Sequence, residues 1–219
     1  GGWQRDEELW QLTAPFDLRP QGQDIIRTWL FSTMLRSTLE DGRTPWRNAA
    51  ISGFIVDPDR KKMSKSKGNV VTPADVLEAH GSDAVRYWAA SSRLGMDAAF
   101  DPQNPTQVKI GRRLAIKVLN AAKFVLSFPV PEGAQVTHAL DASMLTALDS
   151  VVVEATKAFE RYDAARALEL TEAFFWTFCD DYLELVKERA YGAGAAEGAE
   201  PSEATLSARA SLALALDTL

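Results

Sequence analysis

The amino-acid sequence predicts a mostly α-helical protein, in which the end of an α/β domain is followed by a helical domain. The 219 residues are 46% hydrophobic and 25% charged, a balance typical of a folded globular chain. One strand-like apolar run and an exposed loop come first, and only helical apolar spacings follow them. This order places the change of architecture near residues 68–105.

The first third of the chain carries the strand signals. Residues 1–20 hold scattered apolar positions and two prolines, which predict an irregular or short-strand start. Over residues 24–39 the apolar positions have the spacing of a helix with one buried face, and Asp24 is suited to its N-cap. The apolar run at 46–56, interrupted at Gly53, predicts a buried strand that leads into an exposed loop.

All later apolar patterns are helical. Thr72 is suited to cap one helix, with Pro73 in its first turn and Gly81 as its end. The Gly- and Ala-rich stretch 191–203 predicts a loop. The other predicted helices span residues 82–91, 106–128, 141–159, 163–190 and 204–219. Together they predict a helix bundle.

Composition narrows the possible functions. No stretch approaches the ~20 apolar residues of a membrane helix, and the N-terminus lacks an apolar signal core, so we expect a cytosolic protein without membrane contact. A single cysteine, Cys179, excludes an internal disulfide, and with only His80 and His138 we expect no Cys/His metal site.

The charges are unevenly distributed. The net charge is −6, but residues 1–68 carry 11 basic and 9 acidic side chains, a balance of +2, and the remainder therefore carries −8. Two basic runs stand out, 60–67 and 109–123, and the second contains no acidic residue. Any contact with a polyanion such as a nucleic acid is therefore expected at a local patch.

The loop after the predicted strand concentrates positive charge and hydroxyl groups. Residues 61–69, Lys-Lys-Met-Ser-Lys-Ser-Lys-Gly-Asn, contain four lysines and two serines. Ammonium groups on long stems beside hydroxyl donors suit a triphosphate whose charge shifts as a phosphate bond breaks. The alternative interpretation is a solvated lysine loop.

The order of residues 62–66, Lys-Met-Ser-Lys-Ser, is identical to the second signature of the class I aminoacyl-tRNA synthetases, and the chain resembles that family. The resemblance implies ATP, bound with Mg²⁺ as a substrate, at Lys62, Met63, Ser64, Lys65 and Ser66. Lys62 and Lys65 are then the catalytic residues that close over the phosphates, with Lys65 stabilising the α-phosphate as pyrophosphate leaves. Ser64 and Ser66 hold the loop.

Within the class, the chain is similar to the valine enzymes at residues 67–77, 81–88, 17–29 and 178–187. The resemblance implies that residues 1–68 are the C-terminal part of a Rossmann-like nucleotide-binding catalytic domain. Residues 69–103 are then a stem-contact helical connector, and 104–219 an anticodon-binding helical bundle. The implied parent enzyme activates valine with ATP and transfers it to tRNA(Val). The alternatives are an isoleucine or leucine enzyme, and a non-catalytic tRNA-binding paralogue.

The resemblance also assigns two residues near the first predicted helix. Gly22 lets the backbone approach the nucleotide, and Asp24 accepts hydrogen bonds from the ribose hydroxyls. The competing interpretation makes Asp24 only a helix cap. Gln23 stands where many members of the family have histidine, so no contact is assigned to it.

A basic helix face is the candidate tRNA contact. At 100° per residue, five cations of the predicted helix 106–128 lie within an arc of about 140°. They are Lys109, Arg112, Arg113, Lys117 and Lys123. The alternative is an ordinary solvated face. The aromatic cluster at 174–178 and Cys179 are interpreted as core residues rather than a base-stacking platform.

Several parts of a complete class I enzyme do not appear in these 219 residues. The first signature needs two closely spaced histidines, and the sequence offers only His80 and His138. The editing domain is also absent. The opening Gly1-Gly2 and the uncapped end at Leu219 predict an excised segment that is inactive alone and exposes apolar surface where other elements pack.

Overall fold

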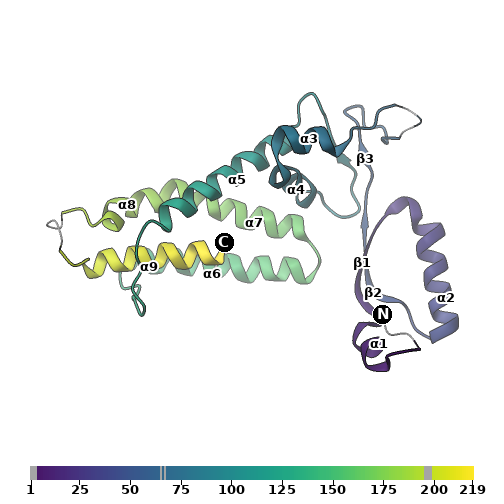
Figure 1. Ribbon diagram of the computed structural model, residues 1–219, viewed down its shortest axis with the longest axis horizontal. Helices are drawn as coiled ribbons and strands as arrows, with labels where there is room; N and C mark the ends of the chain where they lie inside the picture. The colour runs from purple at the N-terminus through teal and green to yellow at the C-terminus, as the bar shows by residue number, and fades with distance from the viewer. Residues whose placement is uncertain (1–3, 65, 67, 195–198) are drawn as a thin grey trace. The chain divides into compact units, whose positions relative to one another are not determined.

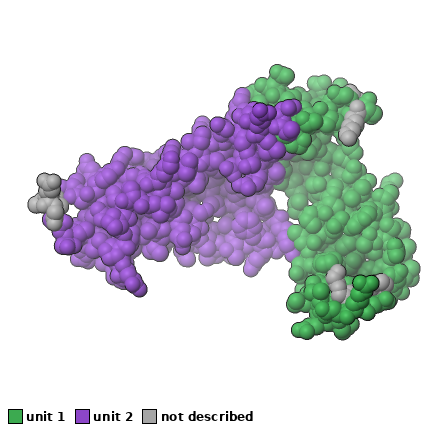
Figure 2. Space-filling model, viewed as in Figure 1, with its two compact units in different colours: residues 1–73, 92–105 green, residues 74–91, 106–219 purple. Residues whose placement is uncertain are grey.

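The computed structural model describes residues 4–64, 66, 68–194 and 199–219, and it divides the chain into two compact units (Figure 2). Unit 1 comprises Gly1–Pro73 and Ser92–Pro105, and unit 2 comprises Ala74–Ser91 and Thr106–Leu219. The stretch predicted as a connector, 69–103, is thus shared between the units. Each unit is described by itself below.

Unit 1 is built on a β-α-β arrangement, in which α2 (Phe31–Asp41) links the parallel strands β1 (Phe16–Gly22) and β2 (Trp46–Ser52) (Figure 1). Their register runs from Phe16 opposite Trp46 to Gly22 opposite Ser52. A second parallel pair joins β3 (Ile55–Val56) to β4 (Ala98–Ala99). The predicted strand at 46–56 is therefore two strands, separated where Gly53 interrupts the apolar run.

Two predictions for unit 1 were only partly right, since β1 is the short strand expected near the start of the chain and α2 overlaps the helix expected at 24–39. The start of the chain contains a helix, α1 (Glu7–Thr13), whose first turn is capped because the Leu9 N–H donates to Asp6 Oδ1 at 3.0 Å. The helix predicted from Asp24 begins instead as two irregular turns, η1 (Gln23–Ile25) and η2 (Ile26–Leu30). The residue before η1 is Gly22 and no side chain caps it, so Asp24 is not the N-cap.

The regular secondary structure in the described part of unit 2 is entirely helical, with loops between the helices. The short helices α3 (Pro73–His80) and α4 (Ser82–Ala90) precede the long helices of the bundle. The bundle contains α5 (Thr106–Val125), α6 (Ala139–Glu160), α7 (Ala164–Thr177), η4 (Phe178–Tyr182), α8 (Leu183–Tyr191) and α9 (Glu203–Thr218). The predicted helix at 163–190 is thus interrupted by a wider π-type turn, η4.

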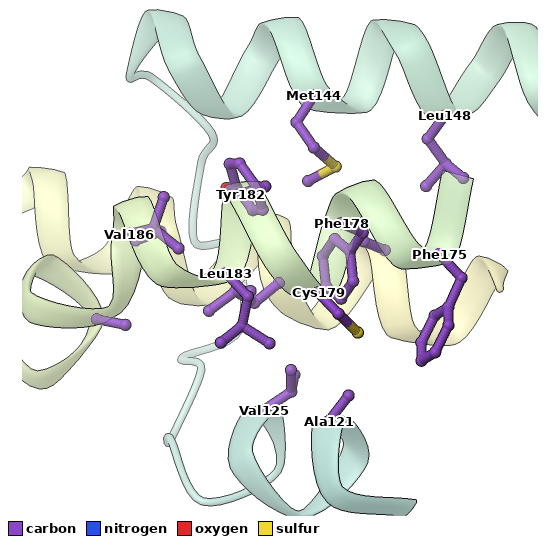
Figure 3. Packing of buried hydrophobic residues seen from close by; sticks show 14 residues of the cluster. Ala121, Val125, Met144, Leu148, Phe175, Phe178, Cys179, Tyr182, Leu183 and Val186 are labelled. Atoms are coloured by element: carbon purple, nitrogen blue, oxygen red, sulfur yellow. The ribbon is translucent and has the colours of Figure 1, made fainter. Parts of the chain in front are cut away.

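The bundle core forms where α5, α6, α7, α8, α9 and η4 face one another (Figure 3). Phe178 and Cys179 of η4 are 1% and 3% exposed, between Met144 of α6 and Ala121 of α5. The interpretation of Cys179 as a buried apolar residue is confirmed, and burial raises the pKa of its thiol to about 11.

The aromatic cluster at 174–178 is mostly core, as predicted. Phe175 and Phe178 are buried and Phe174 packs against the same core. Trp176 differs, because it is only partly buried and its Nε1 donates to Glu172 at 3.1 Å. The sequence pattern alone did not separate Trp176 from its neighbours.

A buried polar network joins α6, α8 and α9. The carboxylate of Asp141 is fully buried and accepts hydrogen bonds from Arg189 Nη2 at 2.6 Å and Nη1 at 2.8 Å. Tyr182 and Ser207 donate to it at 2.8 and 2.6 Å. Burial alone raises the pKa of Asp141, but these donors outweigh burial and hold the pKa below its usual value.

Candidate functional site

The lysine-rich loop in unit 1 begins as an extension of β3. Val56 forms an antiparallel bridge with Lys62, and the Met63 N–H donates to the Ile55 carbonyl at 3.2 Å. The intervening turn closes on Asp57, whose N–H donates to the Lys61 carbonyl at 2.9 Å. The main chain at Lys62 is therefore fixed by a strand rather than left in a free loop.

Lys62 and Asp24, which the family resemblance assigns to one nucleotide site, lie together. The Lys62 Nζ is 3.4 Å from Asp24 Oδ2, and 3.9 Å from the centre of the Phe54 ring. Both charged side chains are about half exposed, at 47% for Lys62 and 52% for Asp24. An exposed ion pair of this kind stabilises little, so both charges stay accessible to a ligand.

The structure gives Gly22 a local role next to Asp24. A Cβ atom at Gly22 would lie 2.8 Å from the Asp24 Oδ1 atom, which is too close. Glycine therefore leaves the space into which the Asp24 carboxylate folds, at the C-terminal end of β1. In α/β folds this end of a parallel strand is where ligands commonly bind.

The remaining signature residues are only partly described. The Ser64 and Ser66 hydroxyls lie 3.2 Å apart, within hydrogen-bonding distance. Met63 is partly buried beside them. Lys65, predicted to be the main catalytic lysine, and Lys67 lie outside the described residues.

Sequence reasoning missed three residues that organise this region: Asn69, Asp57 and Asp97. Asp97 Oδ1 accepts hydrogen bonds from the Phe54 N–H at 2.7 Å and from Gln23 Nε2 at 3.3 Å. Because a Cβ atom at Gly53 would overlap the Met96 backbone, glycine permits this close approach. The Gly interruption of an apolar run was the available signal.

In unit 2, the five cations predicted for tRNA contact do lie on α5, and three of them contact residues of other helices as follows. Lys117 Nζ is 2.9 Å from Asp180 Oδ1, and this hydrogen bond raises the pKa of Lys117. Arg112 Nη1 donates to the His80 carbonyl at 2.9 Å. The Arg113 guanidinium lies 5.7 Å from the centre of the Trp176 ring.

Lys109 and Lys123 are exposed residues near opposite ends of α5. The basic face is therefore only partly available, because Asp180 of η4 contributes an acidic residue that the sequence of α5 does not reveal.

Among the described residues, no group of three or more His, Cys, Asp and Glu side chains is arranged to hold a metal ion. No helix in the described part of the chain has the length and apolarity needed to span a bilayer.

Comparison with known protein families divides the chain in two. Residues 2–101 match "tRNA synthetases class I (I, L, M and V)", and residues 141–219 match the "anticodon-binding domain of tRNA ligase".

Two curated relatives illustrate the similarity. The valine-tRNA ligase of Leifsonia xyli subsp. xyli is 72% identical over 219 residues, which cover 99% of this chain and 25% of the relative. The valine-tRNA ligase of Thermobifida fusca is 61% identical over 223 residues, covering 100% of this chain and 24% of the relative. The chain thus spans about a quarter of the length of these relatives.

Solved structures share the fold. Mycobacterium tuberculosis methionyl-tRNA synthetase in complex with methionyl-adenylate matches with a TM-score of 0.68 at 24% identity, covering 97% of this chain and 43% of that chain. The ternary LeuRS-tRNA-LeuAMS complex of Agrobacterium radiobacter K84 matches with a TM-score of 0.63 at 20% identity, covering 94% and 26%.

Proposed function

We propose that this chain, which belongs to the family of class I tRNA synthetases, works as part of a valine-tRNA ligase. The observation that carries the proposal is the 72% identity to a valine-tRNA ligase across 99% of the chain. The reaction joins valine and ATP to give valyl-adenylate and pyrophosphate, and then transfers valine as an ester to the terminal ribose of tRNA(Val).

In this reaction, unit 1 supplies part of the ATP site. Lys62 neutralises charge on the ATP phosphates, together with Lys65, and Asp24 accepts hydrogen bonds from the ribose. Mg²⁺ arrives with ATP as part of the substrate. The 3.4 Å separation of Lys62 Nζ and Asp24 Oδ2 supports one shared site for the two residues. The Mycobacterium tuberculosis methionyl-tRNA synthetase that shares this fold is in complex with methionyl-adenylate.

Unit 2 supplies tRNA contacts. The match of residues 141–219 to an anticodon-binding domain supports a role for the bundle in binding the anticodon region. The exposed cations of α5, Lys109 and Lys123, are suited to phosphate contacts. Arg112, Arg113 and Lys117 contribute positive potential but must keep or exchange their protein partners when RNA binds.

A chimeric enzyme tests the catalytic part of the proposal. The 219 residues replace the matching segment of the Leifsonia xyli relative, so that the rest of the catalytic machinery is present. We expect valine-dependent exchange of pyrophosphate into ATP and charging of tRNA(Val). Replacing Lys62→Ala in the chimera should lower the exchange rate by on the order of 10²-fold, because one donor to the phosphates is lost.

The control and the contradicting result follow from the same chimera. Asn120→Ala, at an exposed site of α5, should leave pyrophosphate exchange unchanged. A chimera that folds, as judged by circular dichroism, but shows no exchange would refute the proposed role of unit 1 and favour a non-catalytic tRNA-binding protein.

The tRNA part is tested with the chain itself. Filter binding of valine tRNA and isoleucine tRNA is compared across a series of salt concentrations. We expect tighter binding of valine tRNA that persists at higher salt. Equal weak binding of both tRNAs that vanishes as salt rises would reduce the interaction to nonspecific charge attraction and contradict anticodon recognition.

A further inference from the structure

Asn69 makes contacts across the base of the signature loop with both sides of its side-chain amide. The Ser64 N–H donates to Asn69 Oδ1 at 2.9 Å, and Asn69 Nδ2 donates to Asp57 Oδ2 at 2.9 Å. A longer contact of 3.4 Å joins Nδ2 to the Lys62 carbonyl. One side chain therefore contacts Asp57, where the turn begins, and both Lys62 and Ser64, which follow the turn.

Asp57, which Asn69 contacts, is itself held in place by hydrogen bonds and by its position after β3. Its Oδ1 accepts the Lys61 N–H at 2.8 Å, and its own N–H donates to the Lys61 carbonyl at 2.9 Å. The hydrogen bond from Asn69 and the one from Lys61 lower the pKa of Asp57. Asp57 directly follows β3, so its position is tied to the parallel β3–β4 pair.

We propose that Asn69 is a positioning residue for amino-acid activation, which clasps the signature loop to Asp57 and thereby holds Lys62 beside Asp24. The inference rests on the function proposed above for Lys62. Asn69 and Asp57, together with the Ser64 N–H, are called the clasp below.

The chemistry of the clasp explains why an amide is suited to this position. The loop segment 60–62 carries three consecutive cations, which repel one another and favour an open, solvated loop. Holding it closed needs a group that donates to a carboxylate and accepts from an N–H at the same time. A side-chain amide does both without adding charge, whereas a carboxylate in its place would face Asp57 with a second negative charge.

The consequence for catalysis is preorganisation. Lys62 Nζ reaches Asp24 from a main chain that is bridged to Val56 on one side and held by Asn69 on the other. Without the clasp, Lys62 keeps its charge, but its main chain is no longer held in position. Since small displacements of a catalytic group reduce rates strongly, the effect should appear mainly in the rate of activation.

The sharpest test swaps the side chains of the two hydrogen-bonded residues, Asp57 and Asn69. In the chimera, Asn69→Asp places two carboxylates together, and Asp57→Asn removes the acceptor charge. In the double variant D57N/N69D, the amide at position 57 donates to the carboxylate at position 69, which still accepts the Ser64 N–H. Only a direct side-chain contact predicts that the second substitution repairs the first.

The measured quantity is valine-dependent pyrophosphate exchange, resolved into kcat and the KM values for ATP and valine. We expect Asn69→Ala and Asn69→Asp to lower kcat on the order of 10-fold to 10²-fold, with the KM for valine unchanged. We expect D57N/N69D to recover at least part of the kcat lost in N69D. The control Asn120→Ala should keep the kcat of the wild-type chimera. Unchanged kcat in both Asn69→Ala and Asn69→Asp would overturn the proposal. A kcat of D57N/N69D that is lowered by the product of the losses in D57N and N69D would also overturn it.

A second measurement separates this proposal from the proposed function. In the 219-residue chain, hydrogen exchange of the Ser64 and Lys61 amides is measured with and without Asn69→Ala. We expect faster exchange in the variant, because the Ser64 N–H loses its acceptor and Asp57, which accepts the Lys61 N–H, loses the hydrogen bond from Asn69 that holds it. Unchanged exchange would overturn the clasp even if the chimera is active. Faster exchange with an inactive wild-type chimera would uphold the clasp and refute the catalytic function.

Discussion

The guanidinium of Arg189 binds the fully buried carboxylate of Asp141 with two hydrogen bonds, of 2.6 and 2.8 Å, although the residues are 48 positions apart. Arg189 Nη1 also donates at 3.0 Å to the carbonyl of Ala204, in the first turn of α9. This pair ties α6 to α8 and to the start of α9. It is therefore a polar junction within the core of unit 2.

Replacing Asp141→Asn should destabilise the bundle by on the order of 3 kcal/mol, because the partly buried Arg189 charge loses its counter-charge. The measurement is urea unfolding followed by far-ultraviolet circular dichroism, which reports the helices of unit 2. Asp149→Asn is the matched control, since Asp149 lies on the same helix and is exposed. Equal midpoints for D141N and D149N would contradict a stabilising role for the pair.

The same carboxylate should make the stability of the bundle depend on pH in the acid range. The pKa of Asp141 is lowered in the folded state, so its contribution is fully present above the unfolded-state pKa of about 3.9. That contribution is lost as the pH falls through the lower folded-state pKa. The gap in urea midpoint between wild type and D141N should therefore be constant from pH 7 to 5 and shrink below pH 4. A gap that widens in acid would contradict this sign.

Local patterns in the sequence predicted most of the helices but not their interruptions or their long-range partners. The helix at α5 was predicted to within three residues, because its apolar stripe and the following prolines are local signals. Helix α1 was missed since only seven residues and one capping aspartate, Asp6, indicate it. The buried position of Asp141 was not predictable, because Arg189 and Ser207 approach it from other helices.

In the candidate site, too, local sequence order was informative and long-range contacts were not predicted. The order of residues 62–66 indicated a family and hence a role for Lys62, and the resemblance also placed Asp24 near it. The hydrogen bonds that support Lys62 were missed, since Asn69 and Asp57 are separated by a turn that no periodicity describes. The Lys117 to Asp180 contact was missed for the same reason, because it joins α5 to η4.

The salt dependence of tRNA binding should identify which cation of α5 contacts phosphate. Lys123 is exposed on the last turn of α5, so Lys123→Gln should reduce the slope of log K against log salt concentration by about 0.9. Filter binding with valine tRNA gives this slope. Lys157→Gln is the control, since Lys157 is already paired with Glu154 at 2.8 Å on α6 and should leave the slope unchanged. Equal slopes for K123Q and wild type would place the tRNA contact elsewhere.

Helix α4 packs against α5 at a point where only glycine fits. A Cβ atom at Gly111 would lie 2.5 Å from the Tyr87 Cβ, and the Tyr87 hydroxyl donates to Glu172 Oε2 of α7 at 2.7 Å. Burial and the neighbouring Glu172 raise the pKa of Tyr87 to about 12, so the hydroxyl remains a donor throughout the physiological range.

The substitution Gly111→Ala sets two effects of opposite sign against each other. Alanine is favoured over glycine inside a helix by about 1 kcal/mol, so the change would stabilise the protein if α4 did not lie against it. We expect destabilisation instead, on the order of 1 to 3 kcal/mol, because Tyr87 cannot yield without losing its contact with Glu172. Asn120→Ala, exposed on the same helix, isolates the propensity effect and should stabilise slightly. Urea midpoints measured by circular dichroism distinguish the signs. A Gly111→Ala protein as stable as Asn120→Ala would show that α4 does not pack tightly on α5.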